Sequence, residues 1–283
     1  MRNILIYNNI CCHYEIIESI IHKFTNIIIT DISQDIITIK YIENIHFKKY
    51  INNKYKNIIF TNNMIYNEDN YDIIINCTVY NKDIQSIKKL NKNNKKYIFI
   101  AHEITNELKE IKNIYFLTPL CNNNNYFYCD ILPFYSDKKK TNEPIFIIQG
   151  SINNMRRNFN LLDNILNNKY DYKFKIKIIG HSGNKSFAIN NNLIIKSDLN
   201  FIDYHKEFID AYCILPLISY ETHPMYYNNK LTSTINYAKG YNLKILLDNK
   251  LQSIYNMNNA YVYNNTDEFI QKFKFLIKEF YDN

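Results

Sequence analysis

The segment 145–180 constrains the fold most, because it holds a complete strand–helix–strand unit. Four apolar residues and Gln149 are followed by Gly150 and Ser151, and a basic pair, Arg156 and Arg157, then opens a helical pattern. A second apolar run ends at Gly180. Two strands joined through a helix in this way are parallel neighbours in one sheet. The segment therefore predicts an α/β domain.

Glycine is scarce in this chain, so its positions are informative. The four glycines stand at 150, 180, 183 and 240, and the first three follow predicted strands or lie a few residues beyond one. Glycine is needed where the backbone takes a positive φ or comes close to a ligand. A strand, a glycine turn and a helix start together form a seat for a phosphate group. We therefore expect an anion site at these turns.

Short apolar runs alternate with helical patterns along the whole chain, and two of the expected helices lie at 103–111 and 203–211. Strands are expected at 3–7, 26–30, 36–41, 57–61, 71–76, 96–101 and 114–117, and then at 145–149, 174–179, 193–196, 212–215, 243–247 and 261–263. Most are nearly continuous Ile, Phe and Tyr, as in sheets that helices cover on both faces. The alternation predicts two Rossmann-like domains with doubly wound parallel sheets.

The domain boundaries follow from a polar stretch in the middle of the chain. Residues 137–144 are charged or polar and end in proline, which indicates a linker. We expect an N-terminal domain at 1–136, a C-terminal domain at 145–266 and a closing amphipathic helix at 267–283. Ligands of such sheets bind beyond the carboxyl ends of the strands, so the two domains are expected to face a central cleft that holds the site.

Composition excludes several classes of protein. No apolar run approaches the ~20 residues that cross a bilayer, and no signal-peptide pattern follows Met1, so we expect a soluble, cytoplasmic protein. The six cysteines form no C-x-x-C pair, so no zinc or redox motif is indicated. The net charge of +7 comes from dispersed lysines, which favours a solvated surface over nucleic-acid binding. The excess of Ile, Asn, Lys and Tyr is typical of an AT-rich genome, such as that of a protist, an endosymbiont or a large DNA virus.

The second half resembles the nucleotide-sugar-binding domain of GT-B glycosyltransferases, especially the group-1, GT4-like set. The residues that carry the resemblance are Gly150-Ser151, Arg156-Arg157-Asn158, Gly180-His181, Leu215-Pro216 with Glu221, and a helix that ends at Gly240. The resemblance is detailed over about residues 145–265. In the first half of the chain it is limited to the expected order of strands and helices. The resemblance implies a GT-B fold and transfer of a sugar from a UDP- or GDP-type donor to a glycan, protein or small acceptor. It further implies a metal-independent and retaining reaction.

The resemblance also implies roles for individual residues. Arg156 and Arg157, with Ser151 and the amide beside Gly150, would face the donor diphosphate. Further donor contacts are expected from the second turn and from the start of a later helix, at Gly180, His181, Lys230, Thr232 and Ser233. Thr232 and Ser233 are candidate caps of that helix. Basic side chains and helix amino termini would offset the charge of the leaving diphosphate.

Two residues are the candidate catalytic groups. Glu221 would contact the ribose or the sugar, and His102, which follows the strand 96–101 and precedes Glu103, would lie near the reacting carbon.

The sequence departs from the family pattern in two places. Asn229 stands where many relatives carry a second glutamate that binds the ribose, and the turn 8–13 lacks the usual glycines. These departures favour an alternative function, that of a catalytically inactive GT-B protein that binds a nucleotide or glycan as a partner subunit. In either case the resemblance implies that the closing helix packs back on the N-terminal domain.

Overall fold

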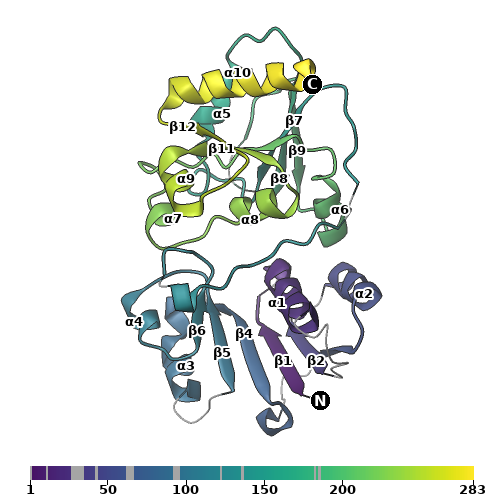
Figure 1. The fold of residues 1–283 in the computed structure, drawn as a ribbon, viewed down its shortest axis with the longest axis vertical. Coiled ribbons are helices and arrows are strands. Elements are labelled where there is room, and N and C mark those ends of the chain that lie inside the picture. Colours follow the sequence, from purple (N-terminus) through teal and green to yellow (C-terminus); the bar gives the residue numbers. More distant parts are fainter. Residues whose placement is uncertain are drawn as a thin grey trace. The chain divides into compact units, whose positions relative to one another are not determined.

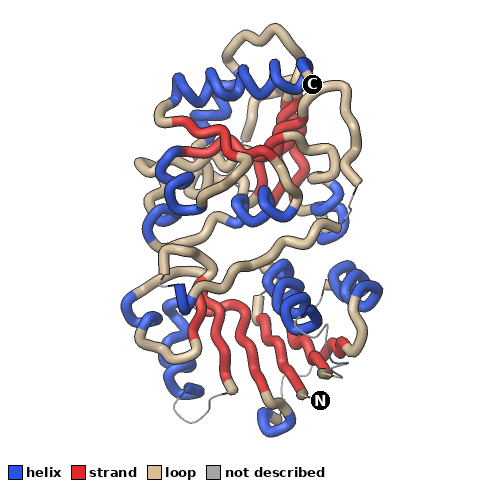
Figure 2. The backbone as a smooth tube through the Cα atoms, viewed as in Figure 1, coloured by secondary structure: helices blue, strands red, loops and turns tan. Residues whose placement is uncertain are grey.

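The protein is described by a computed structural model that covers residues 2–10, 12–26, 35–41, 44–61, 67–91, 96–121, 123–134, 137–181, 183 and 186–283. The chain divides into two compact units. Unit 1 comprises Met1–Leu132 and Asn229–Leu231, and unit 2 comprises Pro133–Asn228 and Thr232–Asn283. Each unit contains one sheet with helices around it (Figures 1 and 2).

The sheet of unit 1 has six strands in the order β3-β2-β1-β4-β5-β6, and all of its strand pairs are parallel. The strands are β1 (Asn3–Asn8), β2 (Ile36–Tyr41), β3 (Ile58–Thr61), β4 (Ile73–Val79), β5 (Tyr97–Ala101) and β6 (Ile114–Phe116). The strand order reverses direction between β1 and β4. Ligands of doubly wound sheets bind at this reversal, beyond the carboxyl ends of the strands.

The helices of unit 1 connect these strands. They are α1 (Tyr14–Asn26), α2 (Ile45–Lys54), α3 (Ile84–Asn91) and α4 (Asn106–Lys109), with short 3₁₀ turns at Glu68–Asn70, Asn81–Asp83 and Asn123–Asn125. Of the strand predicted at 26–30, Asn26 is the end of α1 and the other residues lie outside the described part of the chain. The helix predicted from Glu103 is shorter than expected because Thr105 caps its start, where its side chain accepts a hydrogen bond from the Leu108 amide at 3.2 Å.

The sheet of unit 2 repeats this topology, with the order β12-β11-β10-β7-β8-β9 and parallel pairs throughout. Its strands are β7 (Ile145–Gln149), β8 (Lys175–Gly180), β9 (Leu193–Ser197), β10 (Cys213–Ile214), β11 (Lys244–Asp248) and β12 (Ala260–Tyr263). Its helices are α5 (Phe159–Leu166), α6 (Phe201–Lys206), α7 (Met225–Asn228), α8 (Ser233–Gly240), α9 (Asn249–Tyr255) and α10 (Thr266–Asp282). The two parallel sheets confirm the predicted pair of Rossmann-like folds.

The core of unit 2 explains why the closing helix is amphipathic. Phe269, Phe273, Leu276 and Ile277 of α10 are buried in one apolar cluster with strand residues such as Phe146. The Phe146 and Phe273 ring centroids are 4.3 Å apart. In Figure 1, α10 lies along the sheet of this unit. The buried face of α10 therefore belongs to unit 2, and packing on the N-terminal domain stays a prediction.

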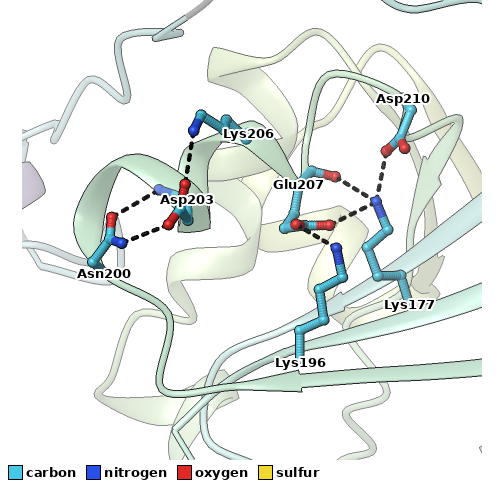
Figure 3. Close-up of polar contacts among 7 residues, drawn as sticks. All are labelled: Lys177, Lys196, Asn200, Asp203, Lys206, Glu207 and Asp210. Atoms are coloured by element: carbon cyan, nitrogen blue, oxygen red, sulfur yellow. Dashed lines mark hydrogen bonds and ion pairs between the residues drawn. The ribbon is translucent and has the colours of Figure 1, made fainter.

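The other face of this sheet contains a buried lysine, Lys177 of β8, which is 4% exposed. Its Nζ lies 2.9 Å from Glu207 Oε2 and 2.7 Å from Asp210 Oδ1, and Lys196 Nζ lies 2.7 Å from Glu207 Oε1 (Figure 3). A buried charge is costly unless it is paired and hydrogen-bonded. The network therefore fixes the segment after α6 against β8 and β9, and it ends the helix that we had expected to continue to residue 211.

The predicted linker is bound along unit 2. The Lys139 amide donates to Ile209 O at 3.0 Å, and Lys138 Nζ donates to Asn242 O at 3.0 Å. Among the helices that the structure describes, none combines the length and apolarity needed to cross a membrane.

Candidate functional site

The first candidate site lies in unit 2, beyond the carboxyl ends of β7 and β10. After Gln149, Gly150 takes a φ of 113°, and the chain forms a loop up to Phe159, where α5 begins. The amides of Arg156 and Arg157 both donate to Asn153 O, at 3.0 and 3.1 Å. The basic pair therefore stands in a turn before the helix, and the prediction that it opens the helix is wrong. The turn is favoured here because the Asn153 side chain also accepts from the Met155 amide.

Arg157 is the central residue of this site and is only 4% exposed. Its guanidinium donates to Gln149 O, to Thr234 Oγ1 at 3.2 Å and to Arg156 O at 2.8 Å, while its Nε has no hydrogen-bond partner among the residues that the structure describes. Within the described part of the chain, Arg157 forms no ion pair with an Asp or Glu. Burial lowers the pKa of Arg157, and nearby tyrosines only partly oppose this effect. The site thus contains a buried positive charge held by neutral oxygen atoms.

Gln149 connects this loop to the start of α8. Its Nε2 donates to Ser233 Oγ at 3.2 Å, and its Oε1 accepts from Thr234 Oγ1 at 3.0 Å. Thr234 thereby bridges Gln149 and Arg157. Sequence reasoning missed Gln149 and Thr234, because no pattern marks a glutamine at the end of a strand as the partner of a distant helix.

Thr232 and Ser233 lie at this helix start as predicted, but they do not cap it with their side chains. Thr232 occupies the N-cap position without a side-chain hydrogen bond to the helix. Its Oγ1 is buried and has no partner within the described residues. The capping prediction is therefore wrong for Thr232, and Ser233 instead accepts from Gln149. The first amides of α8 are consequently not satisfied by these two hydroxyls.

The glycines of this region are explained by close packing between two loops. A Cβ at Gly150 would lie 2.6 Å from Arg157 Nη2, and one at Gly180 would lie 1.6 Å from Gly150 O. A Cβ at Gly183 would lie 1.8 Å from Ile152 O. The turns after β7 and β8 therefore touch through their backbones, and Gly150 provides space for a guanidinium. Contact of Gly150 or Gly180 with a ligand stays a prediction.

The remaining predicted residues of this site are more exposed. Arg156 and Ser151 are partly exposed, and Arg156 Nη1 lies 3.4 Å from Tyr226 OH. The His181 side chain is 77% exposed, with its Nδ1 3.5 Å from Asp198 Oδ1. Glu221 is exposed in the loop that follows β10. Arg156 is thus the accessible cation beside the buried one.

A buried histidine that the sequence analysis did not select joins the two loops of this site. His223 Nε2 lies 3.0 Å from Asn154 O, and its Nδ1 lies 2.7 Å from Thr222 Oγ1. Burial, with the charges of Arg157 and Arg156, lowers the pKa of His223. A neutral His223 that donates to Asn154 O and accepts from Thr222 satisfies both contacts. It holds the loop of Glu221 against the loop of the two arginines.

The second candidate site lies in unit 1, beyond the carboxyl ends of β1, β4 and β5. His102 follows β5 and is 7% exposed. Its ring centroid lies 4.2 Å from that of His13 and 5.3 Å from that of Tyr80. His102 Nε2 is buried without a hydrogen-bond partner among the described residues. The predicted histidine therefore lies in a group of three rings from three strand ends.

The turn after β1 positions His13 without glycine. Asn8 Nδ2 donates to Cys12 O at 2.8 Å, and Asn8 Oδ1 accepts from Thr78 Oγ1 at 2.9 Å. His13 itself takes a φ of 64°, a conformation in which histidine is several-fold enriched among non-glycine residues. Sequence reasoning noted the missing glycines but did not select His13 as a site residue.

Lys230 belongs to unit 1, although we predicted it as a donor contact at the start of α8. Its backbone pairs with Glu103 in an antiparallel bridge, and the Ile104 amide donates to Asn229 O at 2.8 Å. The reason is that residues 229–231 run as a short extended segment beside the end of β5 before α8 begins. Lys230 therefore stands near His102, whose pKa its charge helps to lower.

Comparisons with known proteins support the architecture. The sequence matches no protein-family model and no curated protein. Solved structures do match: the lipopolysaccharide outer core galactosyltransferase WaaB has a TM-score of 0.54 at 15% identity over 99% of this chain and 91% of its own. A glycosyltransferase from Rickettsia africae has a TM-score of 0.59 at 11% identity over 98% and 88%. The chain has the GT-B fold.

The GT-B likeness extends to enzymes of another reaction class. The UDP-GlcNAc 2-epimerase from Neisseria meningitidis, solved with UDP-GlcNAc bound, has a TM-score of 0.53 at 11% identity over 99% of this chain and 93% of its own. At such identities the likeness establishes the GT-B fold and leaves the reaction to be argued from the residues.

Proposed function

We propose that this protein is a glycosyltransferase that moves a sugar from a UDP- or GDP-type donor to a hydroxyl of a glycan, protein or small acceptor. The observation that carries the proposal is the buried charge of Arg157 at the carboxyl end of β7. An unpaired buried cation is costly, and a bound anion would compensate it. The likeness to solved glycosyltransferases of the GT-B fold agrees with a nucleotide-sugar donor.

The proposed donor diphosphate binds at the turn after β7. Arg156 and the amide of Ser151 contact its oxygens, while the neighbouring Gly150 amide donates to Ile179 O at 2.9 Å. Arg157 contributes through its Nε and its positive charge. The start of α8, at Thr232 and Ser233, adds the positive end of a helix whose first turn is not capped by the Thr232 side chain. These groups stabilise the negative charge that develops on the diphosphate as the bond to the sugar breaks. The proposal assigns no role to a metal ion.

The remaining predicted residues take supporting roles in the proposal. Glu221, in the loop that His223 holds, accepts hydrogen bonds from hydroxyls of the ribose or the sugar. Gly180 and His181 border the diphosphate at the turn after β8. In unit 1, His102 is the candidate catalytic residue that receives a hydrogen bond from a substrate hydroxyl, and Lys230 lies beside it.

Thermal shift measurements test donor binding. We expect UDP or GDP to raise the melting temperature more than the corresponding nucleoside does, since the diphosphate meets the cations. A ligand at 100 times its Kd adds about 2.7 kcal/mol to the stability of the native state. Arg156→Gln should weaken diphosphate binding about 10- to 100-fold, the effect of one charge-assisted hydrogen bond.

The matched control is Lys206→Gln, which removes an exposed cation of unit 2 that pairs with Asp203. It should leave nucleotide binding unchanged. An equal loss in both variants, or no stabilisation by any nucleoside diphosphate, would refute the site.

The alternative function is a GT-B protein that binds nucleotide or glycan without turnover. It is favoured by Asn229, which stands in place of the expected carboxylate. The main-chain carbonyl of Asn229 accepts a hydrogen bond from the Ile104 amide. Incubation with a panel of nucleotide sugars separates the two: release of nucleoside diphosphate with sugar transfer supports the transferase. Tight binding without release supports the alternative, and conversion of a UDP-sugar to its C2 epimer would indicate epimerase activity.

A further inference from the structure

The histidine pair of unit 1 has an uneven environment. The His13 and His102 ring centroids are 4.2 Å apart, with the ring planes tilted by 53°. His13 Nδ1 lies 3.1 Å from Glu15 Oε1, whereas His102 forms no ion pair with a carboxylate among the described residues. The His13 side chain is 30% exposed, and the whole of His102 is 7% exposed. The two imidazoles therefore differ in the partners that stabilise a positive charge.

The positive charge of the pair belongs on His13. A carboxylate within hydrogen-bond distance stabilises an imidazolium. Burial opposes the charge on His13, but the side chains of Cys12 and Glu15 outweigh it and raise its pKa to about 10. Two imidazolium ions at this separation would repel each other. When His13 is charged, protonation of His102 is therefore disfavoured.

His102 has the opposite setting. Burial lowers its pKa well below the ordinary value, and the positive charges of His13 and Lys230 act in the same direction. Tyr80 from the end of β4 contacts the ring without a charge. Glu103 is engaged through its backbone with Lys230, and its Oε1 lies 3.5 Å from the Asn81 amide. Among the described residues, the buried thiol of Cys77 on β4 is a further titratable group near His102, and burial raises its pKa, so it is neutral.

The tautomer of His102 follows from its hydrogen bonds. A hydrogen bond with the backbone at Cys77 opposes the lowering of the pKa of His102, and Nε2 has no partner among the described residues, so we assign that bond to Nδ1. This hydrogen bond favours the charged ring, so the ring nitrogen must be the donor and the backbone group must be a carbonyl, which can only accept. Nδ1 therefore carries the hydrogen, and the neutral ring leaves the lone pair of Nε2 as an unused acceptor.

We propose that His13 is a positioning residue that carries the positive charge of the pair and thereby keeps His102 neutral, with its Nε2 ready to accept a hydrogen bond from a substrate hydroxyl. The role toward a hydroxyl rests on the proposed function. The division of charge between the two rings does not, because it follows from Glu15, the burial of His102 and the ring contact.

The test is an NMR titration of the imidazoles in the full chain, which contains seven histidines. Long-range nitrogen–carbon correlation spectra report the charge and tautomer of each ring. His102 should keep the neutral Nδ1–H pattern from pH 5 to 8, a window chosen around the ordinary histidine pKa of about 6.5. His13 should stay charged over the same window. A His102→Gln spectrum assigns the resonance.

Two variants probe the coupling. His13→Asn removes the charge, and asparagine tolerates the positive φ of this position. Glu15→Gln keeps the His13 ring and its packing but removes the carboxylate. Both should raise the titration midpoint of His102, and Glu15→Gln should also lower that of His13. His181→Asn, at an exposed histidine of unit 2, should change neither. Should His13→Asn fail to fold, Glu15→Gln decides the question.

The proposal is overturned if His102 becomes charged within this window while His13 is neutral. It is equally overturned if the His102 midpoint stays constant in the folded variants. If the wild type transfers sugar, the acid limb of its kcat/KM profile should move to higher pH in His13→Asn. In this variant His102 becomes protonated at a higher pH, and the protonated Nε2 can no longer accept a hydrogen bond. An absence of turnover in the wild type would reject the proposed function and leave the titration result standing.

Discussion

Gly150 and Arg157 form an interlocked pair in which a glycine provides space for a charged side chain. The Arg157 guanidinium donates to Gln149 O, and it occupies the space that a side chain at position 150 would need. The sequence pattern suggested that both residues face a ligand. The structure gives each a packing role as well, so a loss of activity on substitution at either position has two physical sources that must be measured separately.

Gly150→Ala should destabilise the protein. Alanine at a φ of 113° is strained, and its Cβ would lie 2.6 Å from Arg157 Nη2. Together these effects should lower the free energy of unfolding by about 1–3 kcal/mol, as measured by urea denaturation. Gly240→Ala is the control, since Gly240 ends α8 without a positive φ. It should be neutral or stabilise by up to about 1 kcal/mol. Equal effects at the two positions would contradict the packing role of Gly150.

At the scale of elements, β8 and the end of α6 depend on one another through Lys177. Burial alone would raise the pKa of Glu207, but hydrogen bonds and charges from Lys196 and Lys177 outweigh it and lower this pKa. The side chains of Lys177 and Glu207 are only 6% and 12% exposed. The contact between strand and helix is therefore ionic where most neighbouring contacts are apolar.

Lys177→Met should destabilise the protein by about 3 kcal/mol near pH 7, because it removes the buried cation that Glu207 and Asp210 share and leaves Lys196 as the remaining partner of Glu207. Lys206→Met, which removes an exposed pair with Asp203, should cost at most about 0.5 kcal/mol. Urea denaturation of both variants measures the difference. A loss in Lys177→Met no larger than that in Lys206→Met would show that the network contributes nothing.

The pH dependence has a defined sign. A carboxyl group whose pKa is lower in the folded state stabilises the protein above its unfolded pKa, about 4.3 for glutamate, and this stabilisation is lost as the pH falls through the folded pKa. The wild type should therefore lose stability below about pH 4 more steeply than Lys177→Met does. An identical acid dependence in the two proteins would argue against the assigned role of Glu207.

The strands were predictable because their signal is local. Runs such as 145–149 and 176–179 are almost wholly apolar, and the observed β7 and β8 follow them closely. Helix lengths were less predictable, since α6 ends where Glu207 and Asp210 bind a lysine that lies 30 residues earlier in the chain. Contacts between distant segments determine three further features: the burial of Arg157, the hydrogen-bond partners of Gln149 and the ring contact between His13 and His102. No window of sequence contains these contacts.

At the scale of the whole molecule, two sheets of identical strand order present their loops at separate carboxyl edges. The proposed diphosphate site draws only on unit 2, from the turn after β7, the loop after β10 and the start of α8. Hydrogen exchange of the full chain can therefore map binding onto one unit.

A nucleoside diphosphate should slow amide exchange at residues 150–158, 215–228 and 232–234 of unit 2, where it adds hydrogen bonds, and leave the buried strands β1 and β4 of unit 1 unchanged. Arg156→Gln should abolish the protection at the same ligand concentration, and Lys206→Gln should retain it. Protection confined to unit 1 would contradict the proposed site.

The path of residues 229–231 has a consequence for the connection between the two candidate sites. A single peptide bond joins Leu231, counted with unit 1, to Thr232, where α8 starts in unit 2. The backbone partners of Glu103 and Ile104 are therefore followed in the chain, with no intervening loop, by the first turn of α8. The strand end that carries His102 and the helix start of the proposed diphosphate site thus share one short stretch of continuous backbone.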